Sequence, residues 1–416
     1  MKGVLVVVDG LGDLPSPIMN GETALDAART INMDFFASRG KMGYMYTVRP
    51  GFIPESDEAV ISIFGNDLIS SSRGQLEARG AKMKLTRGDL AFRVNFGTID
   101  SYEKGNILDR RAGRTLSTKE AEILGKAINK IKVPVKFEFK PTIQHRAALV
   151  FRGGFSDNIS GNDLVYSQGE TKITNKISKC KALDEDENTY YTVNVVNEFL
   201  EKVYEVLKAH PVNIERVKRG LMPANFLFLR GAGVEPPKLK KYPKWVSANY
   251  MPMEIGFSKV SEMKNYSFEY PKLSGIDAYE NLWKGLRKAC KHAIKVVKKS
   301  CKKCDYIYIH LKETDLPGHD NKPVEKKLML EYIDMTLFKF LRNFCPAKNI
   351  KVAITGDHST PCRLKNHSAD PVPVLIYSGE TEVKGERTFC EKEAMGGELG
   401  EITEGKDFLK RIGFNK

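Results

Sequence analysis

The chain has 416 residues, of which 41% are hydrophobic and 28% charged, a composition that excludes a wholly disordered or fibrous protein. Its length exceeds what one ordinary core supports, so we expect two domains. The net charge of +14 permits an anionic partner, but the lysines are scattered among acids as on a solvated surface and no nucleic-acid-binding motif accompanies them, so we expect no nucleic acid partner.

The first predicted element is a strand over residues 2–8, KGVLVVV, whose continuous apolar run is typical of a strand covered on both faces. This run is too short for a signal sequence or a membrane span, and no later segment reaches membrane length. The seven cysteines show no disulfide-like spacing, and Cys301 and Cys304 form an isolated C-x-x-C. We therefore expect a cytoplasmic protein with no membrane association.

The middle of the chain, residues 73–245, has a different sequence pattern from both ends. Short β-like runs such as LAFRVNFGTI and ANFLFLRGAG alternate there with polar loops. We predict that this stretch is an inserted α+β domain that caps the site and binds substrate.

The two ends of the chain predict one discontinuous domain, residues 1–72 and 246–416. Further apolar strands are predicted at 305–311, 349–355 and 372–378, and amphipathic helices at 277–300 and 323–344. This alternation predicts an α/β fold with a mainly parallel sheet flanked by helices.

Acids and histidines follow the predicted strands of this domain. Asp9 ends the first strand, Asp315 and His319 follow the second, Asp357 and His358 follow the third, and His367 precedes the fourth. Ligands in open α/β sheets bind beyond the carboxyl ends of the strands, so these groups should meet. Six such ligands exceed the needs of one ion, which favours two divalent cations such as Zn²⁺ or Mn²⁺.

Each of these residues also has a plain structural interpretation. Asp9 could belong to a turn, Asp357 could cap a helix, and a buried histidine is more often a core residue than a ligand. His310 lies within a predicted strand and is interpreted as a core or supporting residue, whereas His210 and His292 are expected at the surface.

A nucleophile for phosphoryl transfer is offered by Ser56, in the segment PESDEAV before a predicted helix. Ser56 could equally be the N-cap of that helix, and the two roles are compatible because a helix N-terminus favours an anion. Ser62, inside the helix, is the poorer candidate.

The motifs taken together resemble one known family. VVVDGLGDLP, SDEAVISIFG, GQLEARG, LDRRAGR, DLPGHDNKP and AITGDHSTPC look like the archaeal-type cofactor-independent phosphoglycerate mutases of the alkaline phosphatase superfamily. The resemblance covers most of the chain and keeps its order.

The resemblance implies a phosphatase-like core with an inserted domain, and interconversion of 3-phosphoglycerate and 2-phosphoglycerate through a phosphoserine, a step of glycolysis and gluconeogenesis. Ser56 would be the nucleophile, and two divalent ions (Mn²⁺ or Zn²⁺, with Mg²⁺ or Co²⁺ as alternatives) would be bound. One ion would take Asp9, Ser56, Asp357 and His358 as ligands, and the other Asp315, His319 and His367.

The chain also departs from this family. Glu55 and Glu58 flank the nucleophile where the family commonly reads G-S-D-T-A, which places acids beside the incoming phosphate and could slow turnover. Residues 155–175 and 246–275 match poorly, although Lys259 aligns with a lysine near the phosphoserine.

A substrate that carries both a phosphate and a carboxylate calls for guanidinium groups. The candidate substrate-binding residues are Arg93, Arg110, Arg111, Arg114, Arg146, Arg230 and Lys259, and Asp109 or His145 is the candidate for proton transfer. For any single arginine, a surface ion pair is the plainer interpretation.

Two alternatives to the mutase remain open at this point. One is a related two-metal phosphatase, phosphonate-cleaving enzyme or small-alcohol kinase, since fold and metal residues do not separate these activities. The other is a non-catalytic, basic nucleic-acid-binding protein. The oligomeric state is open, and a homo-oligomer is compatible with the sequence.

Overall fold

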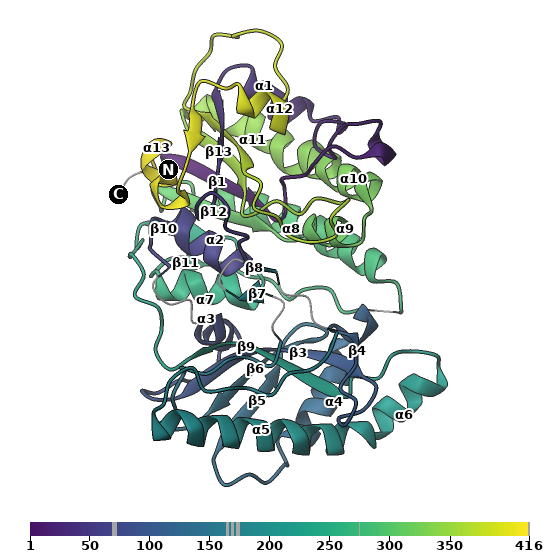
Figure 1. The fold of residues 1–416 in the computed structure, drawn as a ribbon. Coiled ribbons are helices and arrows are strands. Elements are labelled where there is room, and N and C mark those ends of the chain that lie inside the picture. Colours follow the sequence, from purple (N-terminus) through teal and green to yellow (C-terminus); the bar gives the residue numbers. More distant parts are fainter. Residues whose placement is uncertain (69–72, 164–165, 168–169, 172–174, 274, 415–416) are drawn as a thin grey trace.

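The computed structural model describes residues 1–416 except 69–72, 164–165, 168–169, 172–174, 274 and 415–416. Two large sheets lie one above the other in Figure 1, with helices α3 and α7 between them. Both ends of the chain contribute strands to the eight-stranded sheet, and the middle of the chain forms the five-stranded sheet.

The strands are β1 (Gly3–Val8), β2 (Lys41–Met45), β3 (Leu90–Ile99), β4 (Ile107–Asp109), β5 (Phe137–Pro141), β6 (Arg146–Phe151), β7 (Tyr166–Ser167), β8 (Glu170–Thr171), β9 (Phe226–Gly233), β10 (Trp245–Ser247), β11 (Lys264–Asn265), β12 (Tyr306–Leu311), β13 (Lys351–Gly356), β14 (Val372–Tyr377) and β15 (Gly400–Ile402).

The α-helices are α1 (Ile31–Ala37), α2 (Ser56–Ile63), α3 (Arg73–Gly80), α4 (Thr118–Ile128), α5 (Glu187–Lys208), α6 (Pro211–Lys218), α7 (Pro252–Val260), α8 (Ala278–Ser300), α9 (Asp315–His319), α10 (Pro323–Ile333), α11 (Lys339–Phe344), α12 (Glu391–Met395) and α13 (Phe408–Arg411). The 3-10 turns are η1 (Pro17–Met19), η2 (Ala112–Arg114), η4 (Pro346–Lys348) and η5 (Gly405–Asp407), and η3 (Asp334–Phe338) is a π-helical turn between α10 and α11.

The eight-stranded sheet has the order β11-β10-β12-β1-β13-β14-β2-β15. Strands β11, β10, β12, β1 and β13 run parallel, which confirms the predicted α/β fold with a mainly parallel sheet. Strand β14 is the exception, since it pairs antiparallel with both β13 and β2. The start of β14 therefore lies at the same edge as the ends of β1, β12 and β13.

Helices cover both faces of this sheet, as the continuous apolar runs predict. Along β1, Val4, Val6 and Val8 pack into a core with α1, α8, α10 and α11. The alternate residues Leu5 and Val7 pack into a second core with α2, α7 and α13. Because successive strand side chains point to opposite faces, one apolar strand joins two cores.

The five-stranded sheet is antiparallel, with β3 paired to β4, β6 and β9, and β5 paired to β6. Helices α4 and α5 cover one face and build the main core of this part. The other face packs against α3, which also contacts α7. Close approach of α3 and α7 depends on glycine, because a Cβ on Gly256 would lie 1.9 Å from the carbonyl oxygen of Leu76.

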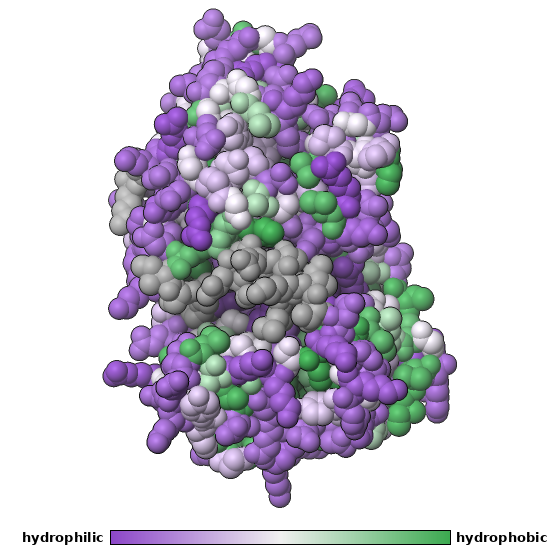
Figure 2. Space-filling view, in the orientation of Figure 1, coloured by the Kyte–Doolittle hydropathy of each residue, from purple (hydrophilic) through white to green (hydrophobic). Residues whose placement is uncertain are grey.

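The outer surface is largely hydrophilic on the face shown in Figure 2, with scattered hydrophobic side chains. Among the described residues, every helix is too short or too polar to cross a bilayer.

Candidate active site

The ends of three neighbouring parallel strands bring the predicted ligands together. Asp9 follows β1, Asp315 follows β12, and Asp357 follows β13. His358 Nε2 lies 3.1 Å from Asp9 Oδ1 and 3.5 Å from Asp357 Oδ2. Asp9, from near the start of the chain, thus lies beside Asp357 and His358, from its C-terminal part.

His319 and His367 lie on the other side of Asp315. His319 Nε2 is 3.3 Å from one carboxylate oxygen of Asp315 and His367 Nε2 is 3.6 Å from the other. The rings of His358 and His367 stack with their centroids 3.7 Å apart. His367 reaches this position because β14 runs antiparallel and begins at the ligand-bearing edge.

Among the residues that the structure describes, two groups of side chains have donor atoms close enough to hold a metal ion. Asp315, His358 and His367 form one group, and Asp9, His310 and Asp357 form the other, with the donor atoms of each group within 4.8 Å of one another. The predicted grouping placed His358 with Asp9. In the structure His358 belongs to the group of Asp315 and His367, and its Nε2 also lies 3.1 Å from Asp9 Oδ1.

The second group also contains buried donor atoms without hydrogen-bond partners, namely Asp9 Oδ1, His310 Nε2 and Asp357 Oδ2. A buried polar atom left unsatisfied is costly, so a cation bound here would compensate all three. The residues therefore fit a divalent metal ion with oxygen and nitrogen ligands.

Burial and neighbouring charges shift the pKa values of this cluster in opposite directions. Burial alone would raise the pKa of the Asp357 carboxyl, but the cationic side chains of His358 and Lys312 hold it well below its ordinary value. Burial disfavours protonation of His358, yet Asp357 and Asp9 raise its pKa to about 9. The Asp357 carboxyl thus stays ionised and attracts cations.

His310 is buried, as predicted for a core or supporting residue. Its Nδ1 lies 2.9 Å from the hydroxyl of Tyr308, and its Nε2 lies 3.3 Å from Asp357 Oδ2. It therefore touches the cluster directly. Its position one residue before the end of β12 was the signal in the sequence for this placement.

Ser56 is the first residue of α2, and its Oγ lies 3.3 Å from His358 Nε2. The interpretation of Ser56 as the N-cap is wrong, because Glu55 occupies that position. The backbone N–H of Glu55 donates to the Glu58 carboxylate at 2.9 Å, as in a capping box. The Ser56 hydroxyl is consequently directed to the cluster and not to the helix backbone.

Lys312, which was not among the predicted site residues, is a largely buried cation in the middle of the cluster. Its Nζ contacts Asp9 Oδ2, and lies 2.9 Å from Glu254 Oε1, 3.7 Å from Asp357 Oδ2 and 3.2 Å from Ser56 Oγ. Burial opposes its charge, but Asp9 and Glu254 raise its pKa above the ordinary value. Its place directly after β12 was the signal, hidden among many surface lysines.

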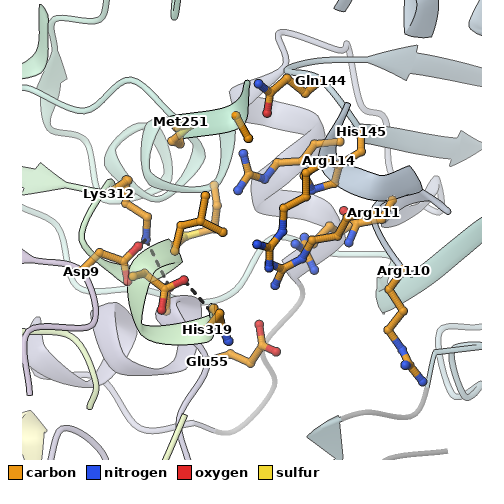
Figure 3. Close-up of a pocket in the computed structure, with 18 of the residues that line it drawn as sticks. Asp9, Glu55, Arg110, Arg111, Arg114, Gln144, His145, Met251, Lys312 and His319 are labelled. Carbon is orange, nitrogen blue, oxygen red and sulfur yellow. Dashed lines mark hydrogen bonds and ion pairs between the residues drawn. The ribbon is translucent and has the colours of Figure 1, made fainter. Parts of the chain in front are cut away.

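A cavity of about 750 Å³ opens between this cluster and the five-stranded sheet. Figure 3 shows Asp9, Lys312 and His319 on one side, facing Arg111 and Arg114 on the other. All six predicted arginines line the cavity: Arg93, Arg110, Arg111, Arg114, Arg146 and Arg230. Arg73, on α3, lines it as well and was not predicted.

The two candidates for proton transfer differ in their contacts. Asp109 Oδ1 accepts hydrogen bonds from the backbone N–H groups of Arg111 and Gly113 at 2.6 and 2.9 Å, so it shapes the arginine loop. His145 is buried, and its Nδ1 has no hydrogen-bond partner. Burial and the neighbouring guanidinium group of Arg146 hold the pKa of His145 well below its ordinary value.

Lys259 is not brought to the cavity. Its side chain is exposed, and its Nζ donates to the carbonyl oxygen of Arg79 at 2.8 Å. It does not line the cavity, so its assignment to substrate binding has no support from the geometry.

The two acids next to Ser56 are less repulsive than the sequence suggested. Glu55 pairs with Arg73 and Arg230. Burial raises the pKa of Glu58 to about 8, so much of this carboxyl is uncharged at neutral pH.

Comparison with known proteins gives consistent matches. A family model described as 2,3-bisphosphoglycerate-independent phosphoglycerate mutase matches residues 37–213. A protein of that name from Pyrococcus horikoshii is 38% identical over 411 residues, covering 96% of this chain and 94% of the relative. One from Methanocorpusculum labreanum is 33% identical, covering 97% and 95%.

Solved structures agree with these matches. A protein from Pyrococcus horikoshii superposes with a TM-score of 0.76 at 29% identity, covering 100% of this chain and 98% of the other. The cofactor-independent phosphoglycerate mutase from Thermoplasma acidophilum superposes with a TM-score of 0.57 at 27% identity, covering 100% and 99%.

Proposed function

The chain belongs to the 2,3-bisphosphoglycerate-independent phosphoglycerate mutases, and we propose that it interconverts 3-phosphoglycerate and 2-phosphoglycerate through a phosphoryl group carried on Ser56. One observation carries the assignment of Ser56. Its hydroxyl, at the N-terminus of α2, lies 3.2 Å from the Lys312 ammonium in a cavity whose lining includes seven arginines.

We assign two divalent metal ions to the carboxylate and histidine cluster. Asp9, Ser56, Asp357 and His358 would hold one ion, and Asp315, His319 and His367 would hold the other. The close donor atoms of Asp9, His310 and Asp357, and of Asp315, His358 and His367, support two ion positions, with His358 and His310 as the donors whose assignment differs. Mn²⁺ or Zn²⁺ suits this mixture of oxygen and nitrogen donors, with Mg²⁺ and Co²⁺ as alternatives. Bound ions would supply Lewis acid stabilisation of the phosphoryl oxygens.

The residues of the chain itself account for the rest of the reaction. Lys312 and the N-terminus of α2 stabilise negative charge on Ser56 Oγ and on the phosphoryl group that it accepts. The arginines Arg93, Arg110, Arg111, Arg114, Arg146 and Arg230 bind the carboxylate and phosphate of the substrate. They also retain glycerate while the phosphoryl group resides on Ser56, so that the other hydroxyl can attack it.

Proton transfer during this exchange is assigned to His145 or Asp109. The contacts favour His145, because it lines the cavity, whereas the Asp109 carboxylate is engaged by the backbone of the arginine loop. Asp109 then acts on the position of Arg111.

The five-stranded part must exclude water while Ser56 carries the phosphoryl group, since water would turn the mutase into a phosphatase. We propose that residues 73–245 form this cap and that residues 1–72 and 246–416 form the metal-binding domain. All seven cysteines are free thiols, which suits a cytoplasmic location.

An assay coupled to enolase tests the proposal. Wild-type protein with Mn²⁺ should convert 3-phosphoglycerate without added 2,3-bisphosphoglycerate, and Ser56→Ala should abolish conversion. Equal activity of Ser56→Ala would refute the role of Ser56. Release of inorganic phosphate faster than formation of 2-phosphoglycerate would contradict the mutase reaction and indicate a phosphatase.

A further inference from the structure

Glu55 lies in the cavity in a position normally suited to an anionic substrate group. Its Oε1 is 3.1 Å from Arg230 Nη1 and its Oε2 contacts Arg73 Nη1, so both carboxylate oxygens face a guanidinium group. The Glu55 side chain is only 16% exposed. Glu55 directly precedes Ser56 in the chain, so these contacts occur beside the hydroxyl that would carry phosphate.

Other acids hold the two arginines in place. Asp163 Oδ2 accepts from Arg230 Nε at 2.8 Å and from Nη2 at 2.6 Å, which leaves Nη1 directed to Glu55. Asp57 Oδ1 accepts from Arg73 Nη1 at 2.8 Å. Glu55 is therefore not required to position either guanidinium group.

The start of α2 uses the Glu55 side chain but does not need its charge. In the capping box the Glu55 side chain accepts from the backbone N–H of Glu58, and the Glu58 side chain accepts from the backbone N–H of Glu55. The amide oxygen of a glutamine at position 55 can accept in the same way. The charge of Glu55 thus serves neither the helix nor the placement of the arginines. Its evident effect is to occupy the cavity-facing surface of Arg73 and Arg230.

We infer that Glu55 sets the affinity of the site for phosphate, because its carboxylate competes with the substrate's anionic groups for Arg73 and Arg230. A phosphate ester that approaches Ser56 must share these two guanidinium groups with the Glu55 carboxylate. Like charges at such short range repel, so Glu55 weakens phosphate binding and favours release of the product. This inference deepens the proposed function and rests on Ser56 as the phosphoryl acceptor.

The Glu55→Gln variant tests the inference, because glutamine keeps the shape of the side chain and removes its charge. Inorganic phosphate is the probe, and its binding to the metal-loaded protein is measured by titration calorimetry at fixed ionic strength. We expect the Kd for phosphate to fall about tenfold, equivalent to about 1.4 kcal/mol. In the enolase-coupled assay, KM for 3-phosphoglycerate should fall, whereas kcat should not rise in proportion.

Glu58→Gln is the matched control, three residues further along the same helix. Glutamine can replace glutamate in a capping box, and Glu58 does not line the cavity. Its phosphate Kd should stay within about twofold of the wild type, well below the effect expected of a full charge removed beside the ligand. If Glu55→Gln does not fold, Glu55→Asn offers the same test with a residue preferred at N-caps.

Unchanged or weaker phosphate binding in Glu55→Gln would overturn the inference and make Glu55 a positioning residue for the arginines. Equal tightening by Glu58→Gln would overturn it too, because the effect would then come from a glutamate-to-glutamine exchange at the start of α2 and not from removal of the charge beside Arg73 and Arg230. The calorimetric result does not depend on turnover. If neither protein converts 3-phosphoglycerate but Glu55→Gln binds phosphate more tightly, the inference stands and the proposed function fails.

Discussion

Replacing Lys312 with methionine tests directly whether its ammonium group stabilises the buried carboxylates and the Ser56 hydroxyl. Methionine keeps an unbranched side chain but removes the ammonium group that lies 2.9 Å from Glu254 and contacts Asp9. The variant leaves these buried carboxylates, and Asp357 beside them, without their shared counter-charge. Two separate effects follow, one on stability and one on catalysis.

The effect on stability should be largest without metal. Removing one partner of a buried ion pair costs about 3–5 kcal/mol, because an uncompensated charge stays buried. The Lys312 side chain is only 14% exposed, so solvent screens little of this loss. We expect urea unfolding of the chelated protein to show a loss near the lower bound, since His358 remains close to Asp9. Saturating Mn²⁺ should reduce the loss.

The effect on catalysis comes from the 3.2 Å contact between Lys312 Nζ and Ser56 Oγ. Loss of one charged donor at a transferring group lowers kcat by about 10²–10³-fold, or about 3–4 kcal/mol. The enolase-coupled assay at saturating metal and substrate measures this change. Lys259→Met is the control, because Lys259 is exposed and outside the cavity, and its kcat and KM should match the wild type.

One result would refute this reasoning. If Lys312→Met kept kcat within about threefold of the wild type, less than 1 kcal/mol by transition-state arithmetic, Lys312 would not stabilise the transferred group. A stability loss with full activity would restrict Lys312 to a structural role. Reduced activity in Lys259→Met would show that the cavity assignment is incomplete.

Three further predictions concern metal, pH and packing. Chelation should abolish turnover, and added Mn²⁺ should restore it. The Asp315→Asn variant should need more Mn²⁺ than the wild type for its half-maximal rate. Full activity after chelation, with metal removal checked by metal analysis, would contradict the two-ion proposal. Burial raises the pKa of Glu391 to about 7, so the folded state keeps a proton that the unfolded chain releases above its ordinary pKa. The stability from the protonated Glu391 is present below about pH 4.5 and is lost as pH rises through 7. Relative to Glu391→Gln, the wild type should lose up to about 3 kcal/mol of unfolding free energy over this range in urea unfolding. Parallel pH profiles of the two proteins would count against a raised pKa of Glu391. Gly256→Ala places a Cβ 1.9 Å from the carbonyl oxygen of Leu76 and should destabilise the protein by about 2–3 kcal/mol. Gly396→Ala is the control and should be near neutral, because the nearest atom to its Cβ is 3.9 Å away. Equal melting temperatures of the two variants would refute the packing argument.

Much of the site could be predicted because strand ends are marked in the sequence. A continuous apolar run that stops at a polar residue identifies both the strand and the position of its carboxyl edge. Asp9, Asp315 and Asp357 were found this way, and they do meet. The arginines were predicted by charge and number, and those on β3, β6 and β9 line the same cavity.

Two of the residues that were missed, Glu254 and Arg73, lack a local signal. Glu254, on α7, approaches the cluster only because α7 packs on the sheet face that also carries His310. Arg73 resembles any helical arginine until its partners are seen. Lys259 illustrates the opposite error, since alignment of a poorly matching segment does not determine the direction of a side chain.

The amino-acid sequence by itself determined four strands of the eight-stranded sheet, the helical segments 277–300 and 323–344, and the kinds of atoms available for chemistry, because apolar periodicity and residue type are local properties. The tertiary structure alone decided the antiparallel direction of β14 that brings His367 to the cluster. It also decided that Lys312 lies among carboxylates and that Glu55 lies between two arginines. Such arrangements depend on contacts between residues far apart in the chain, where burial and charge are set by the whole fold.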